Sequence, residues 1–328
     1  MRKLRFLLVS TCVLCFLSAC KSTGKLSGEK QSWSEAKKNW RNKDGPVVLE
    51  QIGHVSSEKA KSEEVYVVQV GDKKKKKNSN VVVAGVLTED IWDELFPKRY
   101  GVALTGKNSV TEGKSDFYTF EAFVEAAKHF PKFLNEGSQQ IRRRELAAFL
   151  AHLAQETGEF RYLEQITVSR SYSVANRDYP PVSGKDYHGR GPIQLSYNYN
   201  YGQFSQAYFG DKNVLLQDPD MLSRDPVVSF ASAIWFWMTP QSPKPSCHDV
   251  ITGRWYPTGV DKEYKRFPGF GLTLNIINAP QCGQPTQGHT RKRFDYYDRY
   301  CEYFGTTGGD YCDCEQQVPY GRKAVEKN

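Results

Sequence analysis

The chain has 328 residues, a formal net charge of +8 and 39% hydrophobic residues. This hydrophobic content suffices for a packed core, which excludes a chain that is disordered throughout. The eight cysteines are too few for a small fold held together mainly by disulfides. The length fits one large domain with appendages or two smaller domains.

The positive charge is concentrated in the first quarter of the chain. Residues 1–80 hold 17 Lys and Arg against 8 Asp and Glu, whereas the rest of the sequence is nearly neutral. An enzyme acting on nucleic acid needs basic groups around its site, not only in a leading arm. We therefore expect no nucleic-acid partner.

The N-terminus has the features of an export signal. Basic residues among the first five precede the apolar segment 6–19, which is too short to span a bilayer. The segment ends in Leu-Ser-Ala-Cys, which resembles the bacterial lipobox, in which the cysteine is lipidated. We predict a lipoprotein-type signal over 1–20, a lipid anchor at Cys20 and a cell-envelope location. An ordinary signal peptide and a secreted protein are the alternative.

Composition divides the remaining chain into three parts. Residues 21–80 are rich in Ser, Lys, Glu, Gly and Asn, which predicts a basic, flexible tether. Aromatic and apolar residues become frequent from about residue 81, and we predict a folded domain over 81–320. Residues 321–328 are expected to form a C-terminal tail.

The folded part carries helix signals. Thr88 before two acidic residues predicts a helix N-terminus, and segments 120–130 and 142–157 have apolar residues at helical spacing. Asp225-Pro226 predicts the start of another helix, which continues to about residue 239. Strands and helices do not alternate, so we predict a mainly α-helical domain with long, aromatic-rich loops.

Two glutamates near one helix end are candidate catalytic groups. Glu156 falls in the last helical turn, before the helix-ending Gly158, where the helix dipole disfavours a charged carboxylate and favours a general acid. Glu164 follows on another element. Inverting glycosidases place two carboxylates about 6.5–9.5 Å apart, with a water between them. Spacing alone fits solvated surface glutamates as well.

Residues 187–202 interleave amides, hydroxyls and aromatic rings. Amides can pair with sugar hydroxyls and acetamido groups, and rings can stack on sugar faces. A turn-rich packing loop is the other interpretation of this composition.

Several segments together resemble glycoside hydrolase family 19, the plant-type chitinases. They occur in consistent order within about residues 83–320 and comprise 155–158, 189–202, 233–241, 246–250 and 275–278. The resemblance implies a bilobal, lysozyme-like helical domain with a deep substrate cleft. It also implies an endochitinase that hydrolyses β-1,4 links between N-acetylglucosamine units by single displacement with inversion, without a metal or other cofactor.

The resemblance assigns roles to individual residues. Glu156 matches the proton donor, Glu164 the general base, and Ser196 a residue that helps to hold the attacking water. Arg293 matches an arginine that engages a catalytic carboxylate. Substrate contacts are implied for Gln194, Tyr199, Asn200, Lys244 and Asn278.

Three positions depart from the family pattern. Gln155 stands where a histidine usually orients the acid, and Glu159 replaces a glycine and adds a carboxylate that we expect to raise the pKa of Glu156 further. His188 stands where tyrosine is common, either as a buried structural histidine or as a substrate contact.

The cysteines give one implied pairing. Cys282 and Cys314 match the family's C-terminal disulfide, whereas spacing does not fix the pairing of Cys247, Cys301 and Cys312. We expect at least one of these three to be a free buried thiol, and no metal site.

Two other functions stay open: a peptidoglycan-degrading glycosidase, because that polymer has the same sugar linkage, and a catalytically silent chitin-binding protein. The intact segments 235–241 and 275–278 favour chitin or chito-oligosaccharides as the substrate. A monomer is expected.

Overall fold

The computed structural model describes residues 81–99, 117–166, 168 and 172–322. The predicted signal segment, its Cys20 and the tether lie outside these residues, as does most of the predicted tail. Among the described residues, β-structure is limited to isolated bridges, and none of the helices is long and apolar enough to cross a membrane. The expectation of a mainly α-helical domain is confirmed.

The described part of the chain contains ten α-helices and three short 3-10 helices. In order they are α2 (Glu89–Leu95), η1 (Pro97–Arg99), α3 (Phe120–Ala127), α4 (Gln139–Thr157), α5 (Asn198–Phe209), α6 (Asn213–Gln217), η2 (Pro219–Ser223), α7 (Pro226–Met238), α8 (Cys247–Thr252), α9 (Gly259–Glu263), α10 (Phe270–Asn278), η3 (Ala279–Gln281) and α11 (Gly288–Tyr303).

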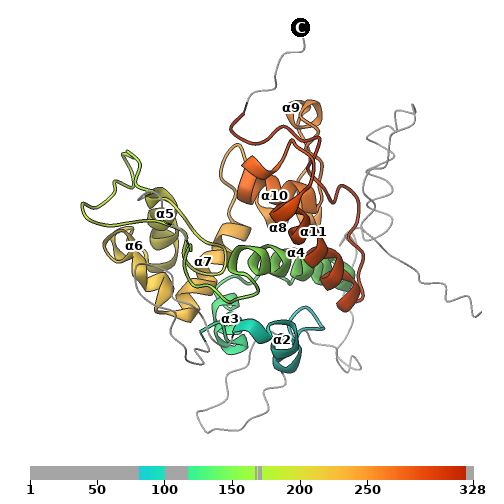
Figure 1. The fold of residues 1–328 in the computed structure, drawn as a ribbon, viewed down its shortest axis with the longest axis horizontal. Coiled ribbons are helices and arrows are strands. Elements are labelled where there is room, and N and C mark those ends of the chain that lie inside the picture. Colours follow the sequence, from blue (N-terminus) through green and yellow to red (C-terminus); the bar gives the residue numbers. More distant parts are fainter. Residues whose placement is uncertain (1–80, 100–116, 167, 169–171, 323–328) are drawn as a thin grey trace, which may run out of the picture.

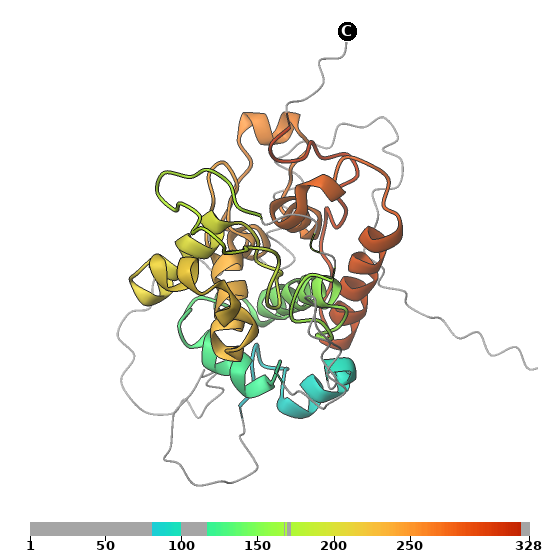
Figure 2. The same cartoon turned by 60° about the vertical axis from the view of Figure 1, so that its left-hand side comes forward.

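Helix α4 lies at the centre of the fold. Helices α5 and α6 are on one side of it and α11 is on the other, packed along α4 (Figures 1 and 2). The Ser138 hydroxyl caps the N-terminus of α4, and Gly158 ends the helix in the left-handed conformation, with φ 61°. A Cβ at position 158 would lie 3.1 Å from the Tyr162 ring, so both backbone and space favour glycine.

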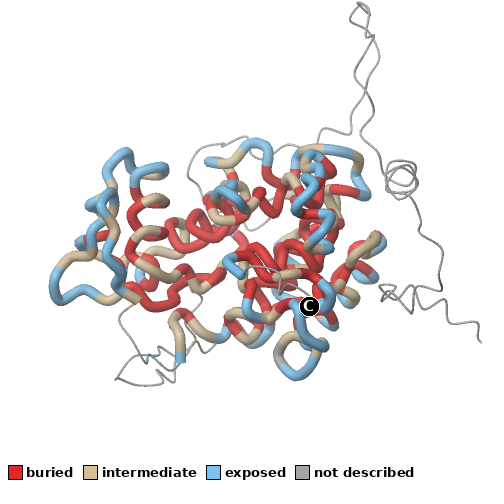
Figure 3. The backbone as a smooth tube through the Cα atoms, turned by 90° about the horizontal axis from the view of Figure 1, so that it is seen from above, coloured by how far each residue is buried: buried red, intermediate tan, exposed pale blue. Residues whose placement is uncertain are grey.

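An aromatic cluster joins the N-terminal helices to α7. The Trp92 ring is fully buried and stacks on Phe123 and Phe160, with ring centroids 5.2 Å apart in both pairs. Its Nε1–H donates to the Tyr118 carbonyl over 2.9 Å, which satisfies the one polar atom of the buried indole. Figure 3 shows the buried positions running through the middle of the molecule, with exposed positions on outer loops.

The predicted helix starts are correct where capping chemistry was visible. The Thr88 hydroxyl accepts from Ile91 N, and Asp225 accepts from Val227 N and Val228 N at the start of α7. The segment 120–130 is helical only to Ala127. Helix α5, which begins inside the amide-rich segment 187–202, was not predicted, and neither were α10 and α11.

A buried ion cluster holds α4 against α8. Glu145 is fully buried and accepts from Trp237 Nε1 at 2.9 Å, while His248 Nδ1 lies 2.6 Å from the same carboxylate. His248 Nε2 lies 2.8 Å from Glu136 Oε2. Burial alone would lower the pKa of His248, but the two carboxylates raise it to about 9. The imidazole is therefore positively charged at neutral pH.

The C-terminal segment returns to the body of the domain and is fastened there. A disulfide joins Cys282, just after η3, to Cys314, as the family resemblance implies. The Tyr320 N–H donates to Asn275 Oδ1 over 2.9 Å, and the Arg266 guanidinium lies 3.8 Å from the centre of the Tyr320 ring. Cys247 and Cys301 are free and buried, which confirms the expectation of a free buried thiol.

Candidate active site

One groove of about 790 Å³ is lined by both candidate glutamates. Glu156 comes from the end of α4 and Glu164 from the loop that follows it. The other lining groups are mainly amides, hydroxyls and aromatic rings. The predicted residues on this lining are Gln194, Ser196, Tyr199, Asn200, Lys244 and Asn278.

Glu156 is held from behind by a buried chain of polar groups. Arg293, on α11, is 1% exposed and pairs with Glu156 Oε1 through Nη2. Its Nη1 donates to His152 Nδ1 over 2.8 Å, and His152 Nε2 lies 2.8 Å from Thr273 Oγ1. The Thr273 hydroxyl donates in turn to the Phe270 carbonyl. This series of contacts thus connects Glu156, at the end of α4, to α10 and α11.

The protonation of His152 follows from its surroundings. Burial, and then the charge of Arg293, lower its pKa well below the ordinary value, so the ring is neutral. A neutral ring that accepts at Nδ1 carries its proton on Nε2 and donates to Thr273. The ion pair with Arg293 places a guanidinium against Glu156, a group that the helix-dipole argument did not include.

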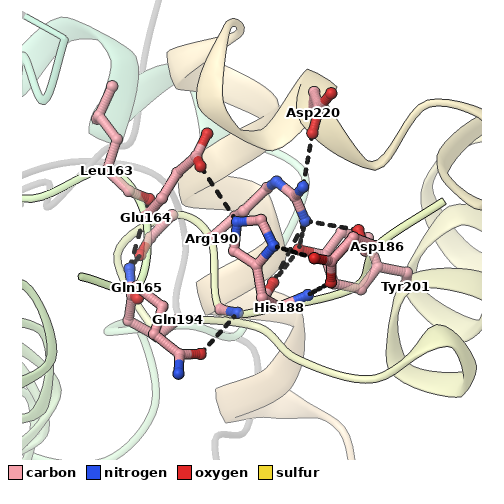
Figure 4. A network of polar contacts seen from close by, with 11 residues as sticks. Leu163, Glu164, Gln165, Asp186, His188, Arg190, Gln194, Tyr201 and Asp220 are labelled. Atoms are coloured by element: carbon pink, nitrogen blue, oxygen red, sulfur yellow. Dashed lines mark hydrogen bonds and ion pairs between the residues drawn. The ribbon is translucent and has the colours of Figure 1, made fainter. Parts of the chain in front are cut away.

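Glu164 lies in a different environment. Its backbone forms an isolated antiparallel β-bridge with the backbone of Arg190. Its Oε2 lies 3.1 Å from His188 Nε2 (Figure 4). Burial raises the pKa of Glu164, but hydrogen bonding from His188 and Ser223 and the positive charge of Arg190 outweigh it, and the pKa lies below its ordinary value. The carboxylate is therefore ionised at neutral pH, as a general base must be.

Arg190 fixes the loop that carries this site. Its side chain is 3% exposed, and Nη2 lies 2.6 Å from Oδ1 of Asp220, in η2. Its Nη1 donates to the Asp186 carbonyl over 3.0 Å and to the Tyr201 hydroxyl over 3.1 Å. The loop between residues 186 and 190 is thereby tied to α5 and η2 (Figure 4).

The lining of the groove contains strained backbone. Gln194 and Tyr197 both have positive φ, 52° and 74°. The Gln194 amide donates to the Gly191 carbonyl over 3.0 Å, and the Ser196 hydroxyl donates to the Gln194 carbonyl over 3.0 Å. Strain of this kind is often found where side chains must be presented to a ligand.

Further lining groups come from α5, α10 and the segment before α8. Asn200 Oδ1 accepts from Gln241 Nε2 over 3.3 Å, and Lys244 Nζ donates to the Ile276 carbonyl over 2.9 Å. Burial lowers the pKa of Lys244. Tyr320, brought in by the C-terminal segment, completes the lining.

The positions that depart from the family pattern have distinct environments. Gln155 is half-buried in the last turn of α4. Glu159 Oε2 lies 2.6 Å from Lys98 Nζ, so its charge is balanced there. The expected effect of Glu159 on the pKa of Glu156 stays a prediction. His188 is buried and contacts Glu164, which favours the structural interpretation over a direct substrate contact.

The sequence indicated Arg293 and singled out His188, but it did not reveal the other residues that support the two glutamates. His152 and Thr273 lie inside helices and look like ordinary core positions, while Asp186 looks like a loop residue. The close spacing of Asp186, His188 and Arg190 in the sequence was the one feature that could have indicated a shared polar cluster. No group of acidic, histidine or cysteine side chains within the described residues could hold a metal ion.

The sequence matches the family described as Chitinase class I over residues 91–314. The chain belongs to glycoside hydrolase family 19. A relative named Endochitinase A2, from Pisum sativum, is 42% identical over 253 residues, which cover 73% of this chain and 74% of that protein. A Hevea brasiliensis relative of 41% identity over 258 residues, 74% of this chain and 79% of that protein, is named Inactive chitinase-like protein 1.

Solved family 19 structures share the fold of this chitinase. The class IV chitinase from Zea mays is 30% identical, with a TM-score of 0.53, and the match covers 70% of this chain and 97% of that one. Chitinase C from Streptomyces griseus is 26% identical with a TM-score of 0.57, covering 73% and 83%. The lysozyme-like helical fold expected from the sequence is confirmed.

Proposed function

We propose that this family 19 chitinase is an endochitinase that cleaves β-1,4 links between N-acetylglucosamine units with inversion. The observation that carries the proposal is the meeting of Glu156 and Glu164 on one groove. Glu156 donates its proton to the glycosidic oxygen as the bond to the anomeric carbon breaks. Glu164 takes a proton from the water that attacks this carbon from the opposite face.

The groove supplies suitable groups for an acetylated sugar. Each N-acetylglucosamine presents hydroxyls and an acetamido group, which need both donors and acceptors. Amides at Gln194, Asn200 and Asn278 provide both, and the Tyr199 ring offers a face for stacking. We assign Ser196 to the attacking water, because it lines the same groove as Glu164. Lys244 is assigned to substrate binding and Arg293 to holding the acid.

The decisive experiment follows the products of chitohexaose by ¹H NMR. Inversion predicts that the α-anomer appears first and then equilibrates with the β-anomer. First appearance of the β-anomer would contradict the assignment of Glu164 as a base. Internal cleavage predicts dimers, trimers and tetramers from the earliest times, whereas release of monomer alone would contradict endo action.

A silent chitin-binding protein is the second candidate, because one similar relative is named inactive. Retention of both Glu156 and Glu164 in the groove favours the enzyme. Binding of chitohexaose by the unmodified protein without any cleavage would establish the silent alternative. Release of sugar from purified peptidoglycan, with no cleavage of chitohexaose, would assign the other substrate.

We further propose export as a lipoprotein, with the signal over 1–20, lipidation of Cys20 and the tether over 21–80. Labelled palmitate should enter the wild-type protein in a bacterial host and should be absent from Cys20→Ala. Equal labelling of the two proteins would contradict the anchor. Without the anchor we expect a secreted protein. We also propose a monomer, which light scattering of the purified protein would test.

A further inference from the structure

His188 and Asp186 form a pair directly behind the proposed base. His188 Nε2 faces Glu164 at 3.1 Å, and its Nδ1 lies 3.3 Å from Asp186 Oδ2. The other Asp186 oxygen accepts the backbone N–H of His188 over 3.1 Å. Both oxygens of Asp186 therefore engage one residue, which fixes the imidazole between two carboxylates (Figure 4).

Further contacts hold the backbone of His188. Its carbonyl accepts from the Tyr201 hydroxyl over 2.7 Å, and this hydroxyl also accepts from Arg190 Nη1 over 3.1 Å. Arg190 is in turn paired with Asp220. His188 is 7% exposed, so its ring is packed within the protein and its backbone is held by these hydrogen bonds.

On this geometry, and resting on the proposed function, we propose that Asp186 and His188 act as positioning residues for Glu164. They orient its carboxylate toward the groove and keep it ionised. The His188 N–H stabilises the charged carboxylate, and Asp186 keeps the ring pointed at it. The pair acts through Glu164 and is assigned no contact with the sugar.

The charged groups around Glu164 determine the sign of the expected effect. They are His188, with Asp186 behind it, and Arg190, with Asp220 behind it. The uncharged hydroxyls of Ser223, Tyr118 and Tyr201 lie around the same carboxylate. Hydrogen bonding from His188 lowers the pKa of Glu164. Loss of the imidazole therefore raises that pKa, and the base becomes protonated at a higher pH than in the wild type.

The test compares pH profiles of kcat/KM on chitohexaose. The acidic limb reports the base of the free enzyme. We expect His188→Ala to move this limb toward higher pH by roughly one unit and to lower kcat about tenfold, with KM nearly unchanged. His188→Gln restores an N–H donor and should recover part of the loss. Asp186→Asn keeps an acceptor for the His188 backbone but removes the charge, and should give a smaller shift of the same sign.

His129→Gln is the matched control, because His129 contacts Tyr208 and does not line the groove. Its profile should coincide with that of the wild type. If the wild type cleaves chitohexaose but the acidic limb is unmoved in both His188→Ala and Asp186→Asn, the positioning role is overturned while the proposed function stands.

A titration of ¹³C-labelled glutamate side chains reads the carboxyl of Glu164 without substrate, with its signal assigned through Glu164→Gln. His188→Ala should raise this pKa even if the wild type cleaves no chitohexaose, which separates failure of the inference from failure of the proposed function. An unchanged titration would overturn the inference.

Discussion

The two carboxylates of the groove are supported in opposite ways. Behind Glu156 lies a chain of buried groups, Arg293, His152 and Thr273, that ends on a helix carbonyl. Behind Glu164 lies the His188 imidazole, followed by Asp186, whose side chain is 39% exposed. The acid is thus held by three helices, whereas the base is held by a loop that ends at solvent.

The two sets of supporting residues should therefore affect activity in different ways. Every supporting group of Glu156 is closed to water, and His152 stays neutral across the physiological range because burial lowers its pKa. The support of Glu164 includes an imidazole within reach of solvent protons through Asp186. Changes behind the acid should therefore alter the rate at all pH values, while changes behind the base should alter its pH dependence.

The largest effect is expected from removing either carboxylate. Glu156→Gln and Glu164→Gln should each lower kcat by about 10³-fold, because each removes a proton-transfer group. Binding of chitohexaose, measured by calorimetry, should be retained. Glu159→Gln changes a neighbouring glutamate paired with Lys98 and serves as control, with activity close to wild type. Substantial cleavage by Glu156→Gln would contradict the assignment of the acid.

The next effect comes from the guanidinium behind the acid. Arg293→Lys keeps the charge, but one ammonium cannot reproduce the two directed contacts to Glu156 and His152. We expect kcat to fall about 10²-fold at every pH measured. Thermal unfolding controls for general damage to the fold. If Arg293→Lys changed only the acidic limb of the pH profile, the supports of Glu156 and Glu164 would not differ in the way described above.

A smaller effect should follow from shortening the chain behind the acid. Thr273→Val preserves shape but leaves the buried His152 N–H without its acceptor. An unpaired buried donor costs about 1–3 kcal/mol of stability, and we expect a loss of about threefold to tenfold in kcat. Ser205→Ala, on the buried face of α5, removes a hydroxyl that likewise accepts an N–H and donates to a carbonyl but does not line the groove. Equal losses in the two variants would assign the effect to packing.

The smallest effect on activity is expected at the ion cluster of His248. Its folded pKa of about 9 exceeds the unfolded value, so its contribution to stability is fully present below pH 6.5 and is lost as pH rises toward 9. The loss should be on the order of 2 kcal/mol in urea unfolding between pH 6 and 9.5. Glu136→Gln removes one carboxylate and should flatten this dependence while kcat stays near wild type. An unaltered slope would contradict the cluster's role.

Capping and periodicity predict the part of the fold that surrounds the acid. Thr88 and Asp225 start helices where their side chains suggested, and Gly158 ends α4 directly after the acid. Helix α5 was missed, because its first residues are amides and tyrosines without an apolar stripe, and it begins after a strained Tyr197. Its amphipathic pattern is weak, so tertiary packing determines that it is helical.

The lining of the groove was predictable only through family resemblance. Every residue proposed to contact substrate lies on it, but the supports of the glutamates come from distant parts of the sequence. His152 and Arg293 are 141 residues apart, and no periodicity relates them. Asp186 and His188 are two residues apart, but their joint contact with Glu164 depends on a loop turning back on itself.

The fastening of the C-terminal segment has a consequence for biosynthesis. Tyr320 forms part of the groove wall, and the cystine between Cys282 and Cys314 anchors the stretch that delivers it. A nascent chain therefore carries both glutamates long before Tyr320 has been synthesised, and this part of the groove wall can form only once the later segment has folded back onto α10.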